Sequence, residues 1–410
     1  MSAQLHSASP ANDGDDTWWE GKDPEAKNAT SQSATSSVVA GGYVSAAQHV
    51  GVFADRILAE LELRVKFGDN AAGGEELGFT EVDEHMVVEG GRLIVMGARE
   101  GVGKTAFGLQ TARTIATRTS SLTGHGGQVV YYITEMGIQE TVERVVATFA
   151  HLDSRKLKRG VTTATVEAVR RGFDLLEKSG LFIVNAAGWT NEDIVRDARA
   201  FHRDNPDLRA VFVDNLTGIN PARTKRAQGS HEYIGEIVES LNMLSMTDKG
   251  IGLPVILLAH LVRPEKMART KRPTAFDFAG SDKINRWASI LVLLHEKSAE
   301  ERSGDGASMP FGGFGKTPAF SPEDTFEVGP GREKWKRSEV GTPDAGCSHE
   351  FIVVKNRGGR KFVSDLDFIG AQLRFVDPKG KTVRPYEMPP AEPAARSQFR
   401  EQMRALGDLF

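Results

Sequence analysis

Cysteine is almost absent from this 410-residue sequence, which contains only Cys347. A single thiol excludes an intramolecular disulfide framework and a cysteine-based zinc site within one chain, as expected in a reducing compartment. Long apolar runs are also absent, and no stretch approaches the roughly 20 residues that a membrane span needs. The N-terminus lacks the charged-then-apolar pattern of a signal peptide. We therefore expect a cytoplasmic protein with no membrane partner.

An excess of one charge sign is missing too, because the net charge is −4. The field of the whole protein therefore gives no indication of a nucleic-acid partner, and any basic footprint must be local. The length and the 40% hydrophobic content suffice for one large α/β domain or two small ones.

Low-complexity composition marks both ends of the chain and one internal segment. Residues 1–45 are polar, lack apolar periodicity and predict a disordered tail, in which Trp18-Trp19 is the one candidate docking peptide. Residues 297–348 are rich in Gly, Ser and Pro and predict a mobile insertion. Residues 379–410 form a Pro-rich C-terminal tail.

A short linker helix is predicted within residues 46–75. Phe53, Ile57, Leu61 and Val65 recur every four residues, which is the spacing of one helical face. Two alternatives are open for what this apolar face packs on, which are the helix's own domain and a neighbouring subunit.

Strand and helix patterns alternate through residues 76–378, which we interpret as one domain. Alternating strands and helices predict an α/β fold with a mostly parallel, twisted sheet and helices on both faces. The predicted strands are residues 93–96, 129–133, 181–184, 210–213, 255–258, 290–294 and 351–354.

A phosphate-binding loop follows the first of these strands. This loop and the start of the next helix, which begins near Lys104, comprise Ala98, Arg99, Glu100, Gly101, Val102, Gly103, Lys104, Thr105 and Ala106. Small residues let backbone N–H groups turn toward phosphate oxygens, the lysine reaches the β- and γ-phosphates, and the threonine holds Mg²⁺. The N-terminus of the helix favours the same anion. The sequence therefore predicts ATP and Mg²⁺ as cofactors.

Three further polar residues each stand at the end of a predicted strand. Asp214 is the candidate for a second Mg²⁺ contact, against the alternative of a loop cap. Glu135 is a candidate for activating water. His260 is a candidate contact to the γ-phosphate, against the alternative of a hydrogen-bonded core histidine.

Together these motifs resemble the ATPase domain of DnaB-family replicative helicases over about residues 76–377. The matching features are the Leu77–Asp83 segment, the loop beginning with Ala98, the Glu135-Met136 pair, Asp214, His260, Lys271-Arg272-Pro273 and Lys355-Asn356-Arg357. The resemblance implies a RecA-like P-loop NTPase fold. It also implies that Lys104, Glu135 and His260 act on the chain's own nucleotide. Lys355 and Arg357 would act on the nucleotide of a neighbouring subunit, in a ring that is expected to be a hexamer.

A local basic segment is the predicted contact with single-stranded DNA. Between Arg263 and Arg286 there are seven basic and three acidic residues, a balance of +4. The resemblance places this segment in the central channel, where it would track a phosphate backbone. A solvated basic loop is the alternative. The candidate contacts are Arg263, Lys266, Arg269, Lys271 and Lys283.

Departures from the family pattern keep other functions open. Nothing here resembles the family's N-terminal helical domain, and Ala279–Asp282 differs from the usual DNA-contacting turn. The leading interpretation is a replication helicase that moves on single-stranded DNA, with a loader, a primase and a sliding clamp as candidate partners. The alternatives are an ATP-switched DNA-binding or assembly protein without unwinding, and a recombination ATPase of the RecA or RadA type.

Overall fold

The computed structural model describes residues 38–39, 43–44, 54–67, 74–118, 127–220, 230–262, 272–278, 280–298, 301, 325–328, 333–336, 348–378 and 384–386. The chain divides into two compact units, residues 1–62 and residues 63–410. The first unit contains the strand pair β1 (Val38–Val39) and β2 (Tyr43–Val44). The second contains the main sheet and the candidate site.

Helix α1 (Ala54–Phe67) confirms the helix expected from the fourfold apolar spacing. Its apolar residues Ile57, Leu58, Leu61 and Val65 are all more than half exposed. Among the residues that the structure describes, these side chains give the helix an exposed apolar face.

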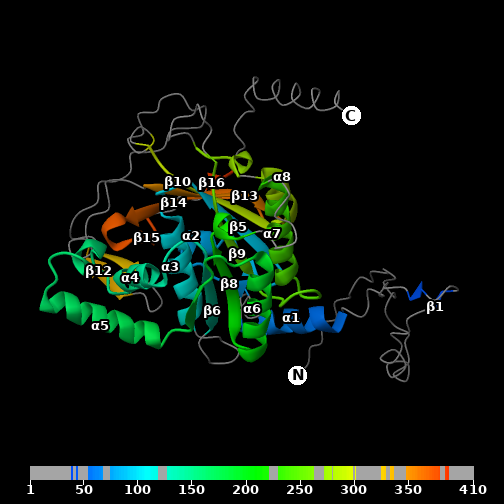
Figure 1. Cartoon of the computed structure of the whole chain (residues 1–410), viewed down its shortest axis with the longest axis horizontal. Helices are drawn as coiled ribbons and strands as arrows, with labels where there is room; N and C mark the ends of the chain where they lie inside the picture. Colours follow the sequence, from blue (N-terminus) through cyan, green and yellow to red (C-terminus); the bar gives the residue numbers. More distant parts are fainter. Residues whose placement is uncertain are drawn as a thin grey trace, which may run out of the picture. The chain divides into compact units, whose positions relative to one another are not determined.

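A ten-stranded sheet forms the centre of the second unit (Figure 1). Its parallel strands are β5 (Leu93–Ala98), β6 (Gln128–Ile133), β7 (Leu181–Asn185), β8 (Leu208–Asp214), β9 (Val255–His260) and β10 (Ile290–Glu296). Its antiparallel strands are β13 (His349–Asn356), β14 (Phe362–Ile369), β15 (Arg374–Val376) and β16 (Arg384–Pro385). The order is β15-β14-β13-β10-β5-β9-β8-β6-β7, with β16 also paired to β14. The predicted mostly parallel sheet is thus confirmed.

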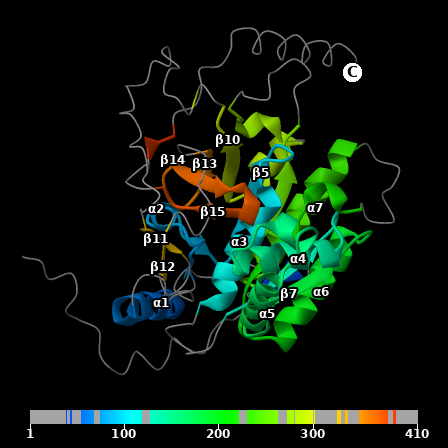
Figure 2. The same cartoon turned by 90° about the vertical axis from the view of Figure 1, so that its left-hand side faces the viewer.

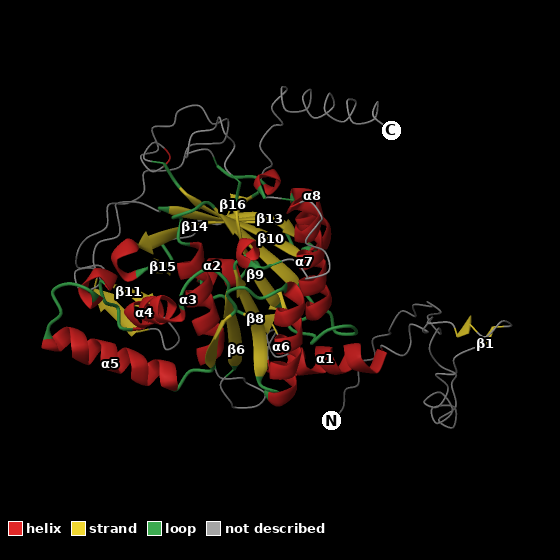
Figure 3. Cartoon of the chain, viewed as in Figure 1, coloured by secondary structure: helices red, strands yellow, loops and turns green. Residues whose placement is uncertain are grey.

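Helices cover both faces of this sheet, as the alternating pattern predicted (Figures 2 and 3). One layer contains α3 (Lys104–Thr117), α4 (Ile138–Phe149) and, packed on α4, α5 (Thr163–Glu177). The other contains α6 (Asn191–Asp204), α7 (Ser230–Ser245) and α8 (Ser281–Trp287). Smaller elements are α2 (Thr80–Asp83), β3 (Gly74–Glu75) and β4 (Val88–Glu89).

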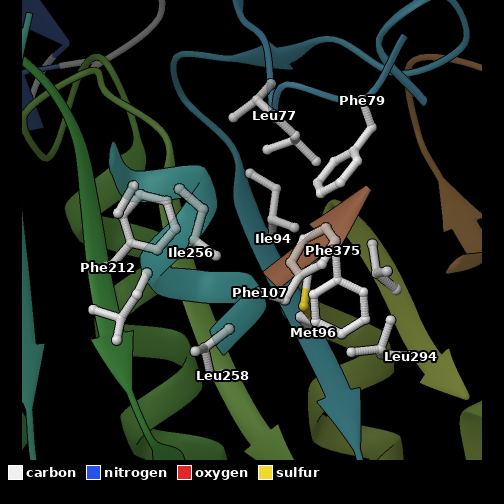
Figure 4. Close-up of a cluster of buried hydrophobic side chains, with 14 of the residues drawn as sticks. Leu77, Phe79, Ile94, Met96, Phe107, Phe212, Ile256, Leu258, Leu294 and Phe375 are labelled. Atoms are coloured by element: carbon white, nitrogen blue, oxygen red, sulfur yellow. The ribbon is translucent and has the colours of Figure 1, made fainter. Parts of the chain in front are cut away.

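Two hydrophobic cores fill the spaces between the sheet and these layers. Ile94 and Met96 of β5 point into one core and Leu93 and Val95 into the other, because side chains alternate along a strand. Figure 4 shows Ile94 and Met96 beside aromatic side chains that include Phe107. Coverage on both faces explains why the central strands are continuous apolar runs.

The antiparallel end of the sheet was only partly predicted. Each of the seven predicted strands lies within an observed strand, but β14, β15 and β16 were not expected. The predicted insertion, residues 297–348, lies mostly outside the described residues, which here include the antiparallel hairpin of β11 (Thr325–Val328) and β12 (Glu333–Lys336). The predicted tails, residues 1–45 and 379–410, lie outside them except for β1, β2, β16 and Tyr386.

Candidate functional site

Strand register brings the predicted residues to one edge of the sheet. Ala98 at the end of β5 lies opposite His260 at the end of β9. Asp214 at the end of β8 lies opposite Leu258 of β9 and Ile133 of β6, two residues before Glu135. The carboxyl ends of neighbouring parallel strands form the usual ligand-binding edge of an open α/β sheet.

The loop from Ala98 to Lys104 joins β5 to the N-terminus of α3. Gly101 and Gly103 have φ angles of +83° and +95°, in the left-handed region that favours glycine. A Cβ at Gly103 would lie 3.0 Å from the Phe375 ring, so this position has little space for a side chain. The first N–H groups of a helix have no partner within it, so this end of α3 can donate to an anion.

Lys104 is a buried ammonium group at the start of α3. Its Nζ lies 3.7 Å from Asp214 Oδ1 and has no hydrogen-bond partner among the described residues. Burial lowers the pKa of Lys104, while Asp214 and Glu135 oppose this effect. An unsatisfied buried cation at this position suits a phosphate oxygen, which supplies both charge and a hydrogen-bond acceptor.

Asp214 and Thr105 are the residues that fit a divalent cation. The Asp214 carboxylate is buried and its Oδ2 accepts a hydrogen bond of 2.9 Å from the Tyr131 hydroxyl. Thr105, next to Lys104 in the first turn of α3, is partly exposed. No group of three or more His, Cys, Asp or Glu side chains in the described part of the chain could hold a metal ion. A carboxylate with a hydroxyl suits Mg²⁺, which completes its shell with water and phosphate oxygens.

Asn215 connects the two remaining site residues, and sequence reasoning did not identify it. Its Nδ2 donates to Glu135 Oε2 and lies 3.1 Å from His260 Nε2, which in turn is 3.4 Å from Glu135 Oε2. Burial acts to raise the pKa of Glu135, but hydrogen bonds from Asn215 and His260 outweigh it and the pKa is lowered. Glu135 is 58% exposed, so its carboxylate is ionised and open to incoming water. The position of Asn215, directly after Asp214, is the one available sequence signal.

Side chains from the antiparallel strands support the phosphate-binding loop. His349 of β13 is buried and its Nε2 lies 3.2 Å from the Val102 carbonyl oxygen. Gln110 of α3 binds both backbone groups of Phe375, its Nε2 donating to the carbonyl and its Oε1 accepting from the N–H, each at 2.8 Å. The three residues were not predicted, because these contacts join segments about 250 positions apart.

Lys355 and Arg357 lie at the opposite edge of the sheet from the loop. Because β13 runs antiparallel to β10, its C-terminal end meets the beginning of β10. The Arg357 N–H donates to the Ser289 carbonyl, and the Ser289 N–H donates to the carbonyl of Leu93, the first residue of β5. The five-residue step from Leu93 to Ala98 spans roughly 16 Å. These two basic residues therefore do not join the chain's own site.

Both basic side chains instead bind the last turn of α8. The Lys355 Nζ donates to the Asn285 carbonyl oxygen, and the Arg357 Nη2 donates to the Arg286 carbonyl oxygen at 2.7 Å. Cationic donors suit the free carbonyl groups at a helix C-terminus.

The predicted DNA contacts are described only in part. Arg263, Lys266, Arg269 and Lys271 lie outside the described residues, whereas Lys283 is exposed on α8. The neighbouring Arg272 forms a 2.7 Å ion pair with Glu350 of β13, which gives this arginine a contact within the domain.

In the described part of the chain, no helix is long and apolar enough to cross a membrane.

Comparisons with known proteins identify the family of this chain. Residues 74–377 match the family model described as DnaB-like helicase C terminal domain. A probable plasmid replicative DNA helicase of Chlamydia psittaci is 27% identical over 225 residues, 55% of this chain and 47% of the relative. The replicative DNA helicase DnaB of Leifsonia xyli is 27% identical over 266 residues, 63% of this chain and 54% of the relative. The chain thus spans about half the length of these relatives.

Solved structures show the same fold. A DnaB-like replicative helicase, studied with its interactions with primase, superposes with a TM-score of 0.60 at 21% identity, covering 82% of this chain and 69% of that one. A solved ATPase domain superposes with a TM-score of 0.59 at 22% identity, covering 79% of this chain and 98% of that one. The expected RecA-like α/β fold is therefore confirmed. Since the matching family model covers most of its length, this chain belongs to the family of DnaB-like helicase C-terminal domains.

Proposed function

We propose that this protein binds and hydrolyses ATP at the edge formed by β5, β6, β8 and β9. The observation that supports this most is Lys104, a buried cation with no hydrogen-bond partner in the described part of the chain and 3.7 Å from the Asp214 carboxylate. Residues 98–106 would bind the phosphates. Thr105 and Asp214 would hold Mg²⁺, which neutralises charge on the β- and γ-phosphates when bound.

Hydrolysis requires a base that is ionised, exposed and oriented. Glu135 has a lowered pKa and an exposed carboxylate, and the Asn215 amide fixes one of its oxygens. It would accept a proton from the attacking water. His260 Nε2 lies 3.4 Å from the same Glu135 oxygen and 3.1 Å from the Asn215 amide nitrogen, so His260 would register the γ-phosphate and pass its loss to Glu135.

We further propose that the protein works as a ring, expected to be a hexamer, in which Lys355 and Arg357 act on a neighbour's nucleotide. Their position at the far edge of the sheet supports action in trans. A guanidinium supplied by a neighbour stabilises charge in the transition state and couples hydrolysis to the subunit interface. Two exposed apolar faces are available for burial in such an assembly, one on α1 and one on α5, where Val166 and Phe173 are about half exposed.

Translocation on single-stranded DNA during replication is the proposed use of this hydrolysis. The basic segment from Arg263 to Arg286 supports a DNA contact through its charge. Relatives carry the name replicative DNA helicase, and one solved structure of the family concerns interactions with primase. A primase, a loader and a sliding clamp are accordingly proposed as partners.

The proposed motor activity is tested by measuring ATP turnover and unwinding of a forked duplex. We expect single-stranded DNA to stimulate turnover and the duplex to unwind, with both activities absent in Lys104→Ala. Turnover that ignores single-stranded DNA, together with an intact duplex, would support the alternative of an ATP-switched DNA-binding protein.

The trans assignment of Arg357 is tested by mixing two inactive variants. Glu135→Gln lacks the base and Arg357→Ala lacks the finger, so each alone should lose at least roughly 10²-fold in turnover. In an equal mixture, roughly a quarter of the heterologous interfaces combine an intact Glu135 with an intact Arg357, and activity should return to that extent.

Lys104→Ala mixed with Glu135→Gln is the control for this mixture. Both substitutions affect the same side of the interface, so every site carries a defect and no activity should return. Equal turnover in the two mixtures would remove the trans assignment.

A further inference from the structure

A pair of buried arginines lies away from the proposed ATP site, between α3, α4 and β15. Arg374 at the start of β15 has no exposed surface, and Arg113 near the end of α3 is more than nine-tenths buried. The Arg113 guanidinium lies 4.6 Å from the centre of the Phe149 ring. Neither arginine is among the residues proposed to bind or hydrolyse ATP. Arg113 lies nine residues after Lys104 along α3.

These guanidinium groups have unused hydrogen-bond donors. The Nε, Nη1 and Nη2 atoms of Arg374 have no hydrogen-bond partner among the described residues, and the same holds for Arg113 Nε. A guanidinium presents five donors in a planar fork, and burial without an acceptor is strongly unfavourable. The arrangement is therefore incomplete without an acceptor.

Positive charge at this position is not relieved by deprotonation. Burial and the charge of Arg113 lower the pKa of Arg374 to about 9, and burial lowers that of Arg113 to about 10. Both groups stay cationic at pH 7. The pKa of the adjacent His151 falls to about 3 through burial and through Arg374 and Arg113, so this imidazole is neutral and adds no third charge. Two like charges thus share one buried region.

We propose that Arg113 and Arg374 form a binding site for a small oxyanion of the phosphate or sulfate class. Such an ion supplies two negative charges and several acceptors to the two forks, in the bidentate geometry that guanidinium groups prefer. The turn that leads into β15 lies at the surface, because Gly370 and Ala371, four and three residues before Arg374, are exposed.

The site is connected to the phosphate-binding loop through the neighbouring residue. Phe375 follows Arg374, is held on both backbone groups by Gln110, and packs its ring against Gly103. An anion on Arg374 would therefore stabilise the strand that supports the loop. This site is independent of the proposed function, because none of its residues contacts nucleotide in that proposal.

Thermal unfolding in inorganic phosphate tests the site, measured against chloride at equal ionic strength. All variants are made in the full chain carrying Lys104→Ala, so that phosphate bound at the ATP site does not contribute. We expect phosphate at about tenfold its dissociation constant to raise the Tm by roughly 2–4 °C. Adding Arg374→Leu should abolish this shift, while the exposed Arg170→Leu on α5 should leave it unchanged.

Arg113→Met gives a second route should Arg374→Leu not fold, and it too should abolish the shift. The inference is overturned when Lys104→Ala shows no phosphate-dependent shift, or when the shift persists in both arginine variants. It is overturned equally when Arg374→Leu alters only the dependence of Tm on protein concentration, since the acceptor would then be a carboxylate of a second copy.

Discussion

The two adjacent tyrosines of β6 offer a matched test of the site. Tyr131 and Tyr132 are both fully buried and point to opposite faces of the sheet. The Tyr131 hydroxyl donates to Asp214 Oδ2 at 2.9 Å, whereas the Tyr132 hydroxyl donates to Asp197 Oδ2 at 2.7 Å on the far side. Phenylalanine at either position removes one hydroxyl and one bond to a carboxylate without changing the packing of the ring.

Both substitutions should destabilise the domain, but only one should affect the site. A hydrogen bond to a charged group contributes about 1.5–3 kcal/mol, so Tyr131→Phe should lower the urea midpoint by roughly 0.5–1 M. Tyr132→Phe should have an effect of similar size. Mutation of a residue that is hydrogen-bonded to a metal ligand typically lowers metal affinity 10–100-fold. Tyr131→Phe should therefore raise the Mg²⁺ concentration that nucleotide binding requires by about that factor.

The assays are urea unfolding followed by circular dichroism, and titration of a fluorescent ATP analogue over a range of Mg²⁺ concentrations. Tyr132→Phe is the control, since it reproduces the loss of stability without touching Asp214. Indistinguishable Mg²⁺ affinities in the two variants would refute the reasoning that Tyr131 positions a metal-binding carboxylate.

Two further changes probe an unpredicted residue and a buried acid. Asn215→Ala should lower ATP turnover roughly 10²-fold while nucleotide affinity stays within a few-fold, because the amide orients Glu135. The control is Asn220→Ala, on a nearby loop, which should leave turnover unchanged. Equal turnover in the two variants would exclude an orienting role for Asn215. Burial raises the pKa of Glu75 to about 7 against the opposing charge of Arg209. Between pH 4.5 and about pH 7 the folded chain keeps a proton on Glu75 that the unfolded chain has released. The free energy of unfolding therefore falls as pH rises through this range, by up to about 3 kcal/mol. Urea unfolding at pH 5 and 7.5 should show a loss of unfolding free energy in the wild type that is smaller by about this amount in Glu75→Gln, where the buried Asp83, whose pKa is also raised to about 7, still contributes.

The features that sequence reasoning predicted are those encoded within short segments. The loop around Lys104 has its glycines, lysine and threonine side by side, and each central strand is a continuous apolar run. Asp214, Glu135 and His260 were identifiable because each ends such a run, and parallel strands deliver their ends to one edge. The spatial grouping of the site thus followed from local patterns and one topological rule.

The features that it missed depend on register and on distant contacts. Tyr131 meets Asp214 across 83 positions, and Gln110 meets Phe375 across 265. Strand β14 was missed because Asp365 and Asp367 interrupt its apolar pattern, and its pairing with β13 is what makes it a strand. The location of Arg357 at the far edge required the direction of β13, which its own residues do not indicate.

The hydrogen bonds from Lys355 and Arg357 to α8 have a consequence for communication between subunits. In the proposed ring, a finger that reaches a neighbour's nucleotide must release the Asn285 and Arg286 carbonyl groups. The last turn of α8 then loses two cationic caps, each worth roughly 0.3–1 kcal/mol near a helix end. Helix α8 carries Lys283 and forms the end of the basic segment. In the proposed ring, the nucleotide of one subunit would therefore compete with the α8 carbonyl groups of the next subunit for the same two side chains. Lys355 and Arg357 would therefore couple the ATP bound by one subunit to the surface of the next subunit that is proposed to bind DNA.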